Sequence, residues 1–269
     1  MSTVWIGAGW KMNKSFAEGE AYARVLKRYI ESQNPEANIF IVPPFTVLKG
    51  VCDLVGDSNL FVGAQNMHWD DAGAYTGEIS PLMLKDCGIR MVELGHSERR
   101  AEFGETDYLV NKKVLSAFRH GLIPLICVGE TGFEKEFDIA GESVVRQVKI
   151  ALHGTPVAKT GEVLLAYEPV WAIGDKGIPA EPEYANRIHG VIRQALSELY
   201  GEERAYRIPV LYGGSVNLEN AQDLMKQPEI DGLFIGRAAW DVEKFVSIIE
   251  SVKGGKGKLS DDSPGRRHV

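Results

Sequence analysis

The segment Ala166-Tyr167-Glu168-Pro169-Val170-Trp171-Ala172-Ile173-Gly174 joins a short apolar strand, expected over 163–167, to a loop that contains proline and glycine. A carboxylate therefore stands where the predicted strand ends. In α/β folds the ligand lies at the carboxyl ends of the strands, on the loops that follow them. Pro169 restricts the root of the loop, and Gly174 can turn its backbone N–H toward an anion. The pattern favours a catalytic base beside a lid, although an exposed Glu that only caps a strand would look the same.

The same arrangement of polar residues and glycines after an apolar strand recurs along the chain. Helical patterns follow each of these clusters, so the clusters are expected to gather at one end of a parallel sheet. The segments are Gly9–Asn13, Glu93–Arg100, Cys127–Glu130, Leu211–Asn217 and Gly232–Arg237.

Strand and helix patterns alternate eight times, which predicts one α/β domain. The strands begin near Val4, Ile39, Leu60, Arg90, Ile123, Val163, Ile208 and Leu233. The helices are expected over Ala17–Glu31, Val47–Val55, Pro81–Asp86, Asp107–His120, Ser143–Leu152, Pro182–Tyr200, Leu218–Lys226 and Val242–Val252. Strands that are apolar on both faces fit a sheet that is covered on both sides. We therefore expect a single (β/α)8 TIM barrel over residues 1–252 and a disordered, Gly- and charge-rich tail over 253–269.

The composition of the chain argues against several classes of function. The 269 residues match a barrel of about 250 residues, and the net charge of −7 argues against nucleic-acid binding. The three cysteines, Cys52, Cys87 and Cys127, form no CxxC pair, which suggests reduced thiols in the cytosol. The sequence shows no signal-peptide pattern, and no apolar run of about 18 residues that would span a membrane. A cytoplasmic protein without a membrane or nucleic-acid partner is expected.

Three polar residues are candidates for chemistry. His96 is expected to begin a short helix, whose N-terminus disfavours an imidazolium ion; alone, it could simply cap a turn. Lys11 follows the first strand and could polarise a carbonyl oxygen, although a lone lysine is normally a solvated surface residue. Glu98, two residues past His96, is a carboxylate that the helix dipole favours at a helix start.

Backbone amides rather than an arginine cluster would bind a phosphate. Barrels often form such a site after strands seven and eight, beside a helix N-terminus. The candidate positions, on the loops after strands six, seven and eight, are Gly174, Ser215, Gly236 and Arg237. Gly213-Gly214 taken alone is only a weak turn signal.

Together the five segments, in this order, resemble the triose-phosphate isomerase family from Trp5 to about Ile249. The resemblance implies proton transfer through a cis-enediolate, with Glu168 as base and a neutral His96 as electrophile, the role known for this family. It also implies that Lys11 binds substrate and pairs with Glu98, and that Gly174, Ser215, Gly236 and the amide of Arg237 hold the phosphate. The lid at Gly174 would close over the substrate, as lids of this family do.

The resemblance further implies a homodimer and no cofactor. The loop Met67–Thr76 would insert into the second subunit, where Thr76 would touch the neighbouring site. No metal is expected, since HExxH is absent and the six histidines are scattered. Cys127 and Glu130 match a family motif near the base, and Cys127 is interpreted as a packing residue.

The chain departs from the main triose branch at several positions. Gly9 replaces an Asn that reaches over the reacting end of the substrate, and Arg237 replaces a second glycine. The lid, Gly174–Ala180, is one residue longer. With these departures the segments Met67-His68-Trp69, Gly177-Ile178-Pro179 and Arg237–Trp240 resemble a side branch, the L-erythrulose-1-phosphate isomerases.

The side branch implies conversion of L-erythrulose-1-phosphate to D-erythrulose-4-phosphate in erythritol catabolism. Gly9 would then make room for the additional CH₂OH group. The alternative is triose-phosphate isomerase itself, which interconverts dihydroxyacetone phosphate and D-glyceraldehyde-3-phosphate in glycolysis and gluconeogenesis. Two alternatives from other classes are a non-catalytic phosphate-binding barrel, which would not need Lys11, His96 and Glu168 together, and a metal-dependent barrel hydrolase, whose ligands are missing.

Overall fold

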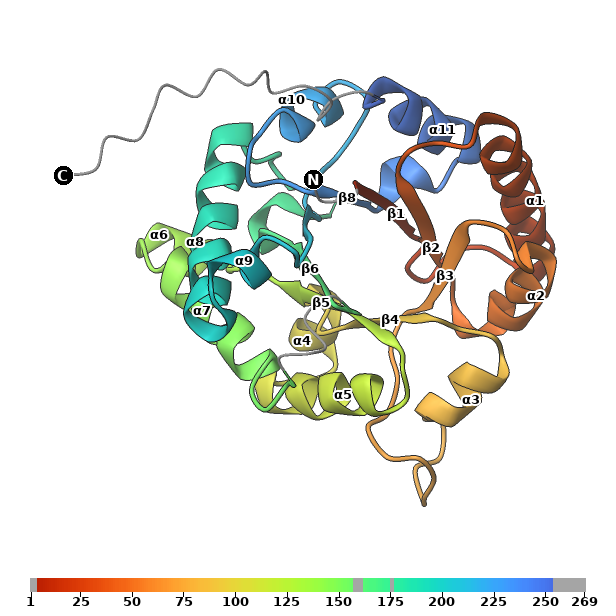
Figure 1. The fold of residues 1–269 in the computed structure, drawn as a ribbon, viewed down its shortest axis with the longest axis horizontal. Coiled ribbons are helices and arrows are strands. Elements are labelled where there is room, and N and C mark those ends of the chain that lie inside the picture. The colour runs from red at the N-terminus through yellow and green to blue at the C-terminus, as the bar shows by residue number, and fades with distance from the viewer. Residues whose placement is uncertain (1–3, 157–161, 175–176, 254–269) are drawn as a thin grey trace.

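Eight parallel strands form a closed barrel in sequence order, with β8 paired to β1. The computed structural model describes residues 4–156, 162–174 and 177–253. The strands are β1 (Trp5–Gly9), β2 (Asn38–Val42), β3 (Leu60–Ala64), β4 (Met91–Leu94), β5 (Ile123–Val128), β6 (Leu164–Tyr167), β7 (Val210–Tyr212) and β8 (Gly232–Ile235). Figure 1 shows this barrel at the centre of the molecule, inside a ring of helices. The predicted barrel is confirmed; residues 254–269 of the predicted tail lie outside the described residues.

The helices that surround the barrel follow the predicted order (Figure 1). They are α1 (Phe16–Gln33), α2 (Phe45–Val55), α3 (Pro81–Asp86), α4 (Ser97–Glu102), α5 (Asp107–Arg119), α6 (Gly132–Glu136), α7 (Ala140–Ala151), α8 (Pro182–Tyr200), α9 (Glu202–Ala205), α10 (Ala221–Met225) and α11 (Val242–Ser251). Two 3-10 turns, η2 (Val170–Ala172) and η3 (Arg237–Ala239), lie on the loops after β6 and β8.

Local side-chain hydrogen bonds explain where the helices differ from the prediction. The helix expected from Leu218 begins only at Ala221, because the side-chain oxygen of Asn217 accepts from the N–H groups of Glu219 and Asn220 and holds a turn there. The short helix α6 was not predicted; a capping box between Thr131 and Glu134 starts it.

Apolar side chains fill both faces of the barrel wall, as the strand patterns predicted. One set lies between the strands and the helices. A second set fills the interior, and its aromatic members Phe40 and Phe234 stack with their ring centroids 5.5 Å apart. Strand β1 makes room for them with glycine, since a Cβ at Gly7 would lie 1.9 Å from the Phe40 ring.

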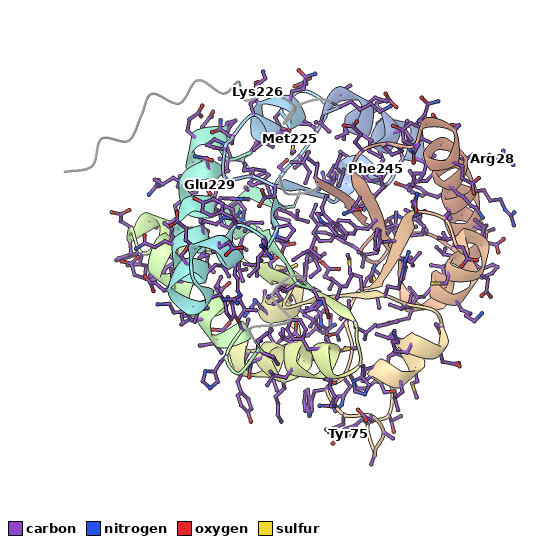
Figure 2. All side chains as sticks on the ribbon, in the orientation of Figure 1. Arg28, Tyr75, Met225, Lys226, Glu229 and Phe245 are labelled. Carbon is purple, nitrogen blue, oxygen red and sulfur yellow. The ribbon has the colours of Figure 1, made fainter. Side chains whose placement is uncertain are left out.

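The connection between β3 and α3 projects from the body of the molecule (Figure 1), and Figure 2 places Tyr75 on this projection. Residues 71–78 are exposed. Within the loop, the His68 ring lies 4.0 Å from the ring centroids of both Trp69 and Tyr75. Met67 is fully buried in the core of its own chain. Met67, which begins the loop expected to insert into a second subunit, is therefore not available for such a contact, whereas Tyr75 is exposed.

Among the helices that the structure describes, none is both long and apolar enough to cross a membrane.

Candidate active site

Glu168 follows β6 directly and its side chain is almost fully buried. Its backbone N–H donates to Val128 O at 2.7 Å, which extends the pairing of β6 with β5 beyond the strand end. Its carbonyl oxygen packs against Gly129, where a Cβ would lie only 1.8 Å away. The carboxylate therefore has a fixed root, and its Oε1 lies 3.5 Å from His96 Nε2. Its Oε2 accepts from the Ser97 N–H at 3.4 Å.

His96 caps α4, as the sequence predicted. Its Nδ1 accepts from the Glu98 N–H at 3.2 Å, so the neutral ring carries its proton on Nε2, the nitrogen that faces Glu168. Burial lowers the pKa of His96, but the carboxylates of Glu168 and Glu93 outweigh burial and raise it above the usual value. The helix N-terminus favours the neutral ring as expected, but the sequence prediction left out the two carboxylates, which act in the opposite direction.

Lys11 reaches the same site from the loop after β1. Its backbone has a left-handed φ of 53°, which is uncommon for a residue other than glycine. The Gln65 amide holds this turn by donating to Lys11 O at 2.7 Å and to Val42 O at 3.1 Å. The Lys11 ammonium donates to Glu98 Oε1 at 2.7 Å, which is the predicted pair. Burial raises the pKa of Glu98, but this bond and the charges of His96 and Lys11 together outweigh burial and lower it.

The predicted phosphate positions lie on three loops at this end of the barrel. A Cβ at Gly236 would lie 3.7 Å from Lys11 Cε, so this backbone borders the lysine side chain. Arg237, which follows, begins η3 and its side chain is exposed. Gly174 has a φ of 85°, a backbone that glycine adopts easily. Ser215 is half-buried, and its carbonyl accepts from the Asn220 amide at 2.9 Å. Asp175 and Lys176 of the predicted lid lie outside the described residues.

Glu130 fastens the loop after β6 to the loop after β5. Its Oε1 accepts from Trp171 Nε1 at 2.7 Å, from the Tyr184 hydroxyl at 2.9 Å and from the Tyr167 hydroxyl at 3.0 Å. These bonds connect η2, α8 and β6 to one buried carboxylate. Cys127 is fully buried in the barrel interior, and burial raises its thiol pKa well above the usual value, in agreement with a packing residue.

Glu93 was missed as a site residue, although it begins the predicted segment Glu93–Arg100. It lies within β4, its side chain is buried, and it is grouped with His96 and Glu168. One ligand atom of each residue lies within 4.8 Å of the others, so the three could hold a metal ion. That no metal is needed stays a prediction. A charged residue inside the apolar strand Met91-Val92-Glu93-Leu94 was the signal that could have found it.

Thr76 is exposed on the projecting loop. Its predicted contact with a neighbouring site requires a second subunit and stays a prediction.

Comparison with known proteins agrees with this geometry. The sequence model of triosephosphate isomerase matches residues 4–252. The chain therefore belongs to the triosephosphate isomerase family, a family of isomerases. Among its curated relatives, proteins named L-erythrulose-1-phosphate isomerase are similar over nearly their whole length. The one from Rhizobium rhizogenes is 51% identical over 246 residues, which cover 91% of this chain and 93% of the relative. The relative from Brucella abortus is 51% identical, and the match covers 93% of this chain and 96% of the relative. The relative from Rhizobium meliloti is 49% identical, and the match covers 93% of this chain and 97% of the relative.

Proposed function

We propose that this protein interconverts L-erythrulose-1-phosphate and D-erythrulose-4-phosphate by proton transfer, without a cofactor. The observation that carries the proposal is the approach of the Glu168 carboxylate to within 3.5 Å of His96 Nε2, with Lys11 held in the same site by Glu98. Identity of about 50% to relatives that carry the name of this activity supports the choice of substrate.

The proposed reaction moves a carbonyl group by one carbon. Glu168 takes the proton from C3 of the substrate, and the electrons of the C–H bond form an enediolate across C2 and C3. The Nε2–H of His96 and the ammonium of Lys11 stabilise the charge that develops on the two oxygens. The proton then returns to C2, while the proton of the C3 hydroxyl moves to the oxygen on C2, so that the carbonyl group stands at C3. General acid–base catalysis contributes about 10²–10⁴-fold, and the oriented charges supply the rest.

The backbone of Gly174, Ser215, Gly236 and Arg237 would hold the phosphate. Backbone N–H groups at such turns can donate hydrogen bonds to an anion. We further propose that the protein is a homodimer and works in the cytoplasm. The three free cysteines fit a reducing compartment.

The proposal is tested by comparing kcat/KM for L-erythrulose-1-phosphate and for dihydroxyacetone phosphate. We expect at least a tenfold preference for the four-carbon substrate. Glu168→Gln is the control variant: kcat should fall by several orders of magnitude, because an amide cannot take the proton, while ligand binding is retained. A preference for the triose would assign the protein to its alternative function, triose-phosphate isomerase. Glu168→Gln with more than a tenth of the activity would contradict the mechanism.

A further inference from the structure

Glu93 is a buried carboxyl group that the mechanism above does not use. Only 6% of the residue is exposed. It extends from β4 among apolar side chains of the barrel interior, which include Met91 on its own strand and Leu125 on the next. In the part of the chain that the structure describes, its one hydrogen-bond donor is the Cys127 thiol, with Sγ 3.8 Å from Glu93 Oε1. Thiols are weak donors, so this carboxyl group keeps the capacity for a further hydrogen bond.

Burying a charge is costly, which favours the protonated form of this carboxyl group. Burial, with the neighbouring Glu168 charge, raises the pKa of Glu93 to about 7, although His96 opposes the shift. Near neutral pH a large fraction of this carboxyl group therefore keeps its proton. In that form it can both donate a hydrogen bond to a hydroxyl group and accept one.

The position of Glu93 relates it to one part of the proposed substrate. Its carboxyl group lies within 4.8 Å of ligand atoms of both His96 and Glu168, the residues that flank the reacting carbon. In the four-carbon ketose phosphate, the terminal CH₂OH group is attached to the carbon that loses its proton to Glu168. Its hydroxyl oxygen is only two bonds from that carbon. In dihydroxyacetone phosphate the same carbon carries a hydrogen in place of CH₂OH.

We propose that Glu93 binds the terminal hydroxyl group of the substrate and so selects a four-carbon ketose phosphate over a triose phosphate. This inference rests on the proposed function and deepens it. A site built around a hydrogen bond to a substrate hydroxyl rejects the analogue that lacks it, because the protein group is then left buried and unpaired. An apolar pocket for one additional carbon would discriminate much less. Glu93 supplies this polar recognition.

The test separates hydrogen bonding from size. Glu93→Met keeps the length of the side chain and removes its hydrogen-bonding atoms, whereas Glu93→Gln keeps both size and hydrogen bonding. Cys127→Ala is a matched control, since it removes the protein donor to Glu93 and leaves the carboxyl group in place. For each variant, kcat/KM is measured for L-erythrulose-1-phosphate and dihydroxyacetone phosphate, and folding is checked by the midpoint of urea unfolding.

We expect Glu93→Met to lower kcat/KM for the four-carbon substrate by about 30-fold or more, with less than a threefold loss on the triose. Glu93→Gln should keep most of the preference, and Cys127→Ala should leave the ratio of the two values within threefold of the parent. Equal loss on both substrates in Glu93→Met or Glu93→Gln would overturn the inference and make Glu93 a positioning group for His96 and Glu168. A parent enzyme that acts on the triose alone would overturn the proposed function first, and this inference with it.

Discussion

Three carboxylates surround His96, and their surroundings shift the pKa values of two of them, Glu98 and Glu93, in opposite directions. Glu98 is half-exposed, and its bond from Lys11 lowers its pKa, so it stays charged. Glu93 lies in the apolar interior, where burial raises its pKa to about 7. Glu168 has His96 on one oxygen and the Ser97 amide on the other. Environments that separate titratable groups in this way allow one site to hold an acid, a base and a fixed charge together.

Gly9 supports a prediction about substrate size, and the packing around Gly9 decides which variants test it. The backbone of Gly9 lies in strand β1 and not in the left-handed region, so conformation alone does not require glycine. A Cβ there would lie 3.0 Å from Phe234 Cζ, which means that an Asn side chain must displace this ring. We expect Gly9→Asn to lower kcat/KM for the four-carbon substrate by tenfold or more and to spare activity on the triose, because a steric block costs about 1–3 kcal/mol or more.

The double variant Gly9→Asn/Phe234→Leu separates size selection from damage to the core. It removes part of the ring that the introduced asparagine side chain would meet, so it should recover the melting temperature and keep the altered substrate ratio. A parallel decline on both substrates in the double variant would refute the role of Gly9 in size selection. The two rates and the melting temperature are measured for the single and double variants together.

At the level of elements, the alternation of apolar strands and helices was sufficient to predict the barrel. Each observed strand begins within two residues of its predicted start, because apolar runs between turn residues define strands well. Lys11, Glu98, His96 and Glu168 lie on loops after strand ends, where barrel sites lie, and the resemblance to the family gave them their roles. Glu93 and Gln65 were missed. One lies inside a strand, and the other acts through hydrogen bonds to backbone carbonyls that no sequence pattern displays.

Lys14, in the loop after β1, connects this loop to the loop after β8, which carries part of the candidate phosphate site. Its backbone is left-handed, with φ 78°, and its ammonium donates to Trp240 O at 2.6 Å, just after η3. The ammonium also lies 4.8 Å from the Tyr22 ring centroid, while the Tyr22 hydroxyl donates to Ala239 O at 2.7 Å. The Trp240 indole N–H donates to Gly9 O at 3.2 Å. The loops after β1 and β8 are therefore fastened to each other.

We expect Lys14→Met to loosen this connection and to raise KM and the Ki of inorganic phosphate about tenfold, because the loss of one charged hydrogen bond is worth about 1.5–3 kcal/mol. The value of kcat should change less than threefold, since the reacting residues stay in place. Lys27→Met is the matched control: Lys27 also donates to a backbone carbonyl, Leu54 O at 3.0 Å, but on the outer face of the barrel. Equal effects of the two variants on phosphate binding would show that Lys14 contributes only to stability.

For the whole molecule, the buried Glu93 makes stability depend on pH. Its pKa is about 7 when folded and 4.5 in the reference state, so the unfolded chain loses this proton first as pH rises. The contribution of Glu93 to stability is therefore most favourable below pH 4.5, and it falls as pH rises toward 7. The charged groups that act on Glu93 are His96, Glu168, Lys11 and Glu98.

Glu93→Gln removes this titration, so we expect the variant to gain stability over the parent as pH rises. The difference in the free energy of unfolding should be larger at pH 8 than at pH 5 and should reach the order of a few kcal/mol, since one pKa unit corresponds to about 1.4 kcal/mol. Urea unfolding at the two pH values measures it. A difference that is constant between pH 5 and pH 8 would show that Glu93 has an ordinary pKa.

The projecting loop between β3 and α3 predicts how two copies of the protein assemble. Tyr75 is 44% exposed there, Thr76 beside it is exposed, and the loop extends away from the body of its own chain (Figure 2). A projecting loop with an exposed aromatic ring is typical of an interaction site.

We expect a homodimer in which this loop enters the partner and Thr76 reaches the partner's site. Tyr75→Ser should raise the dimer dissociation constant at least tenfold, because a large apolar contact is lost, and should lower activity at concentrations where monomers form. Leu218→Ser is the control, since Leu218 is 54% exposed but lies before α10, on the opposite side of the barrel in Figure 1. Sedimentation equilibrium, with activity measured over the same concentration range, gives both quantities. A parent protein that is fully active as a monomer at micromolar concentration would exclude this assembly and leave the loop without a role in the site.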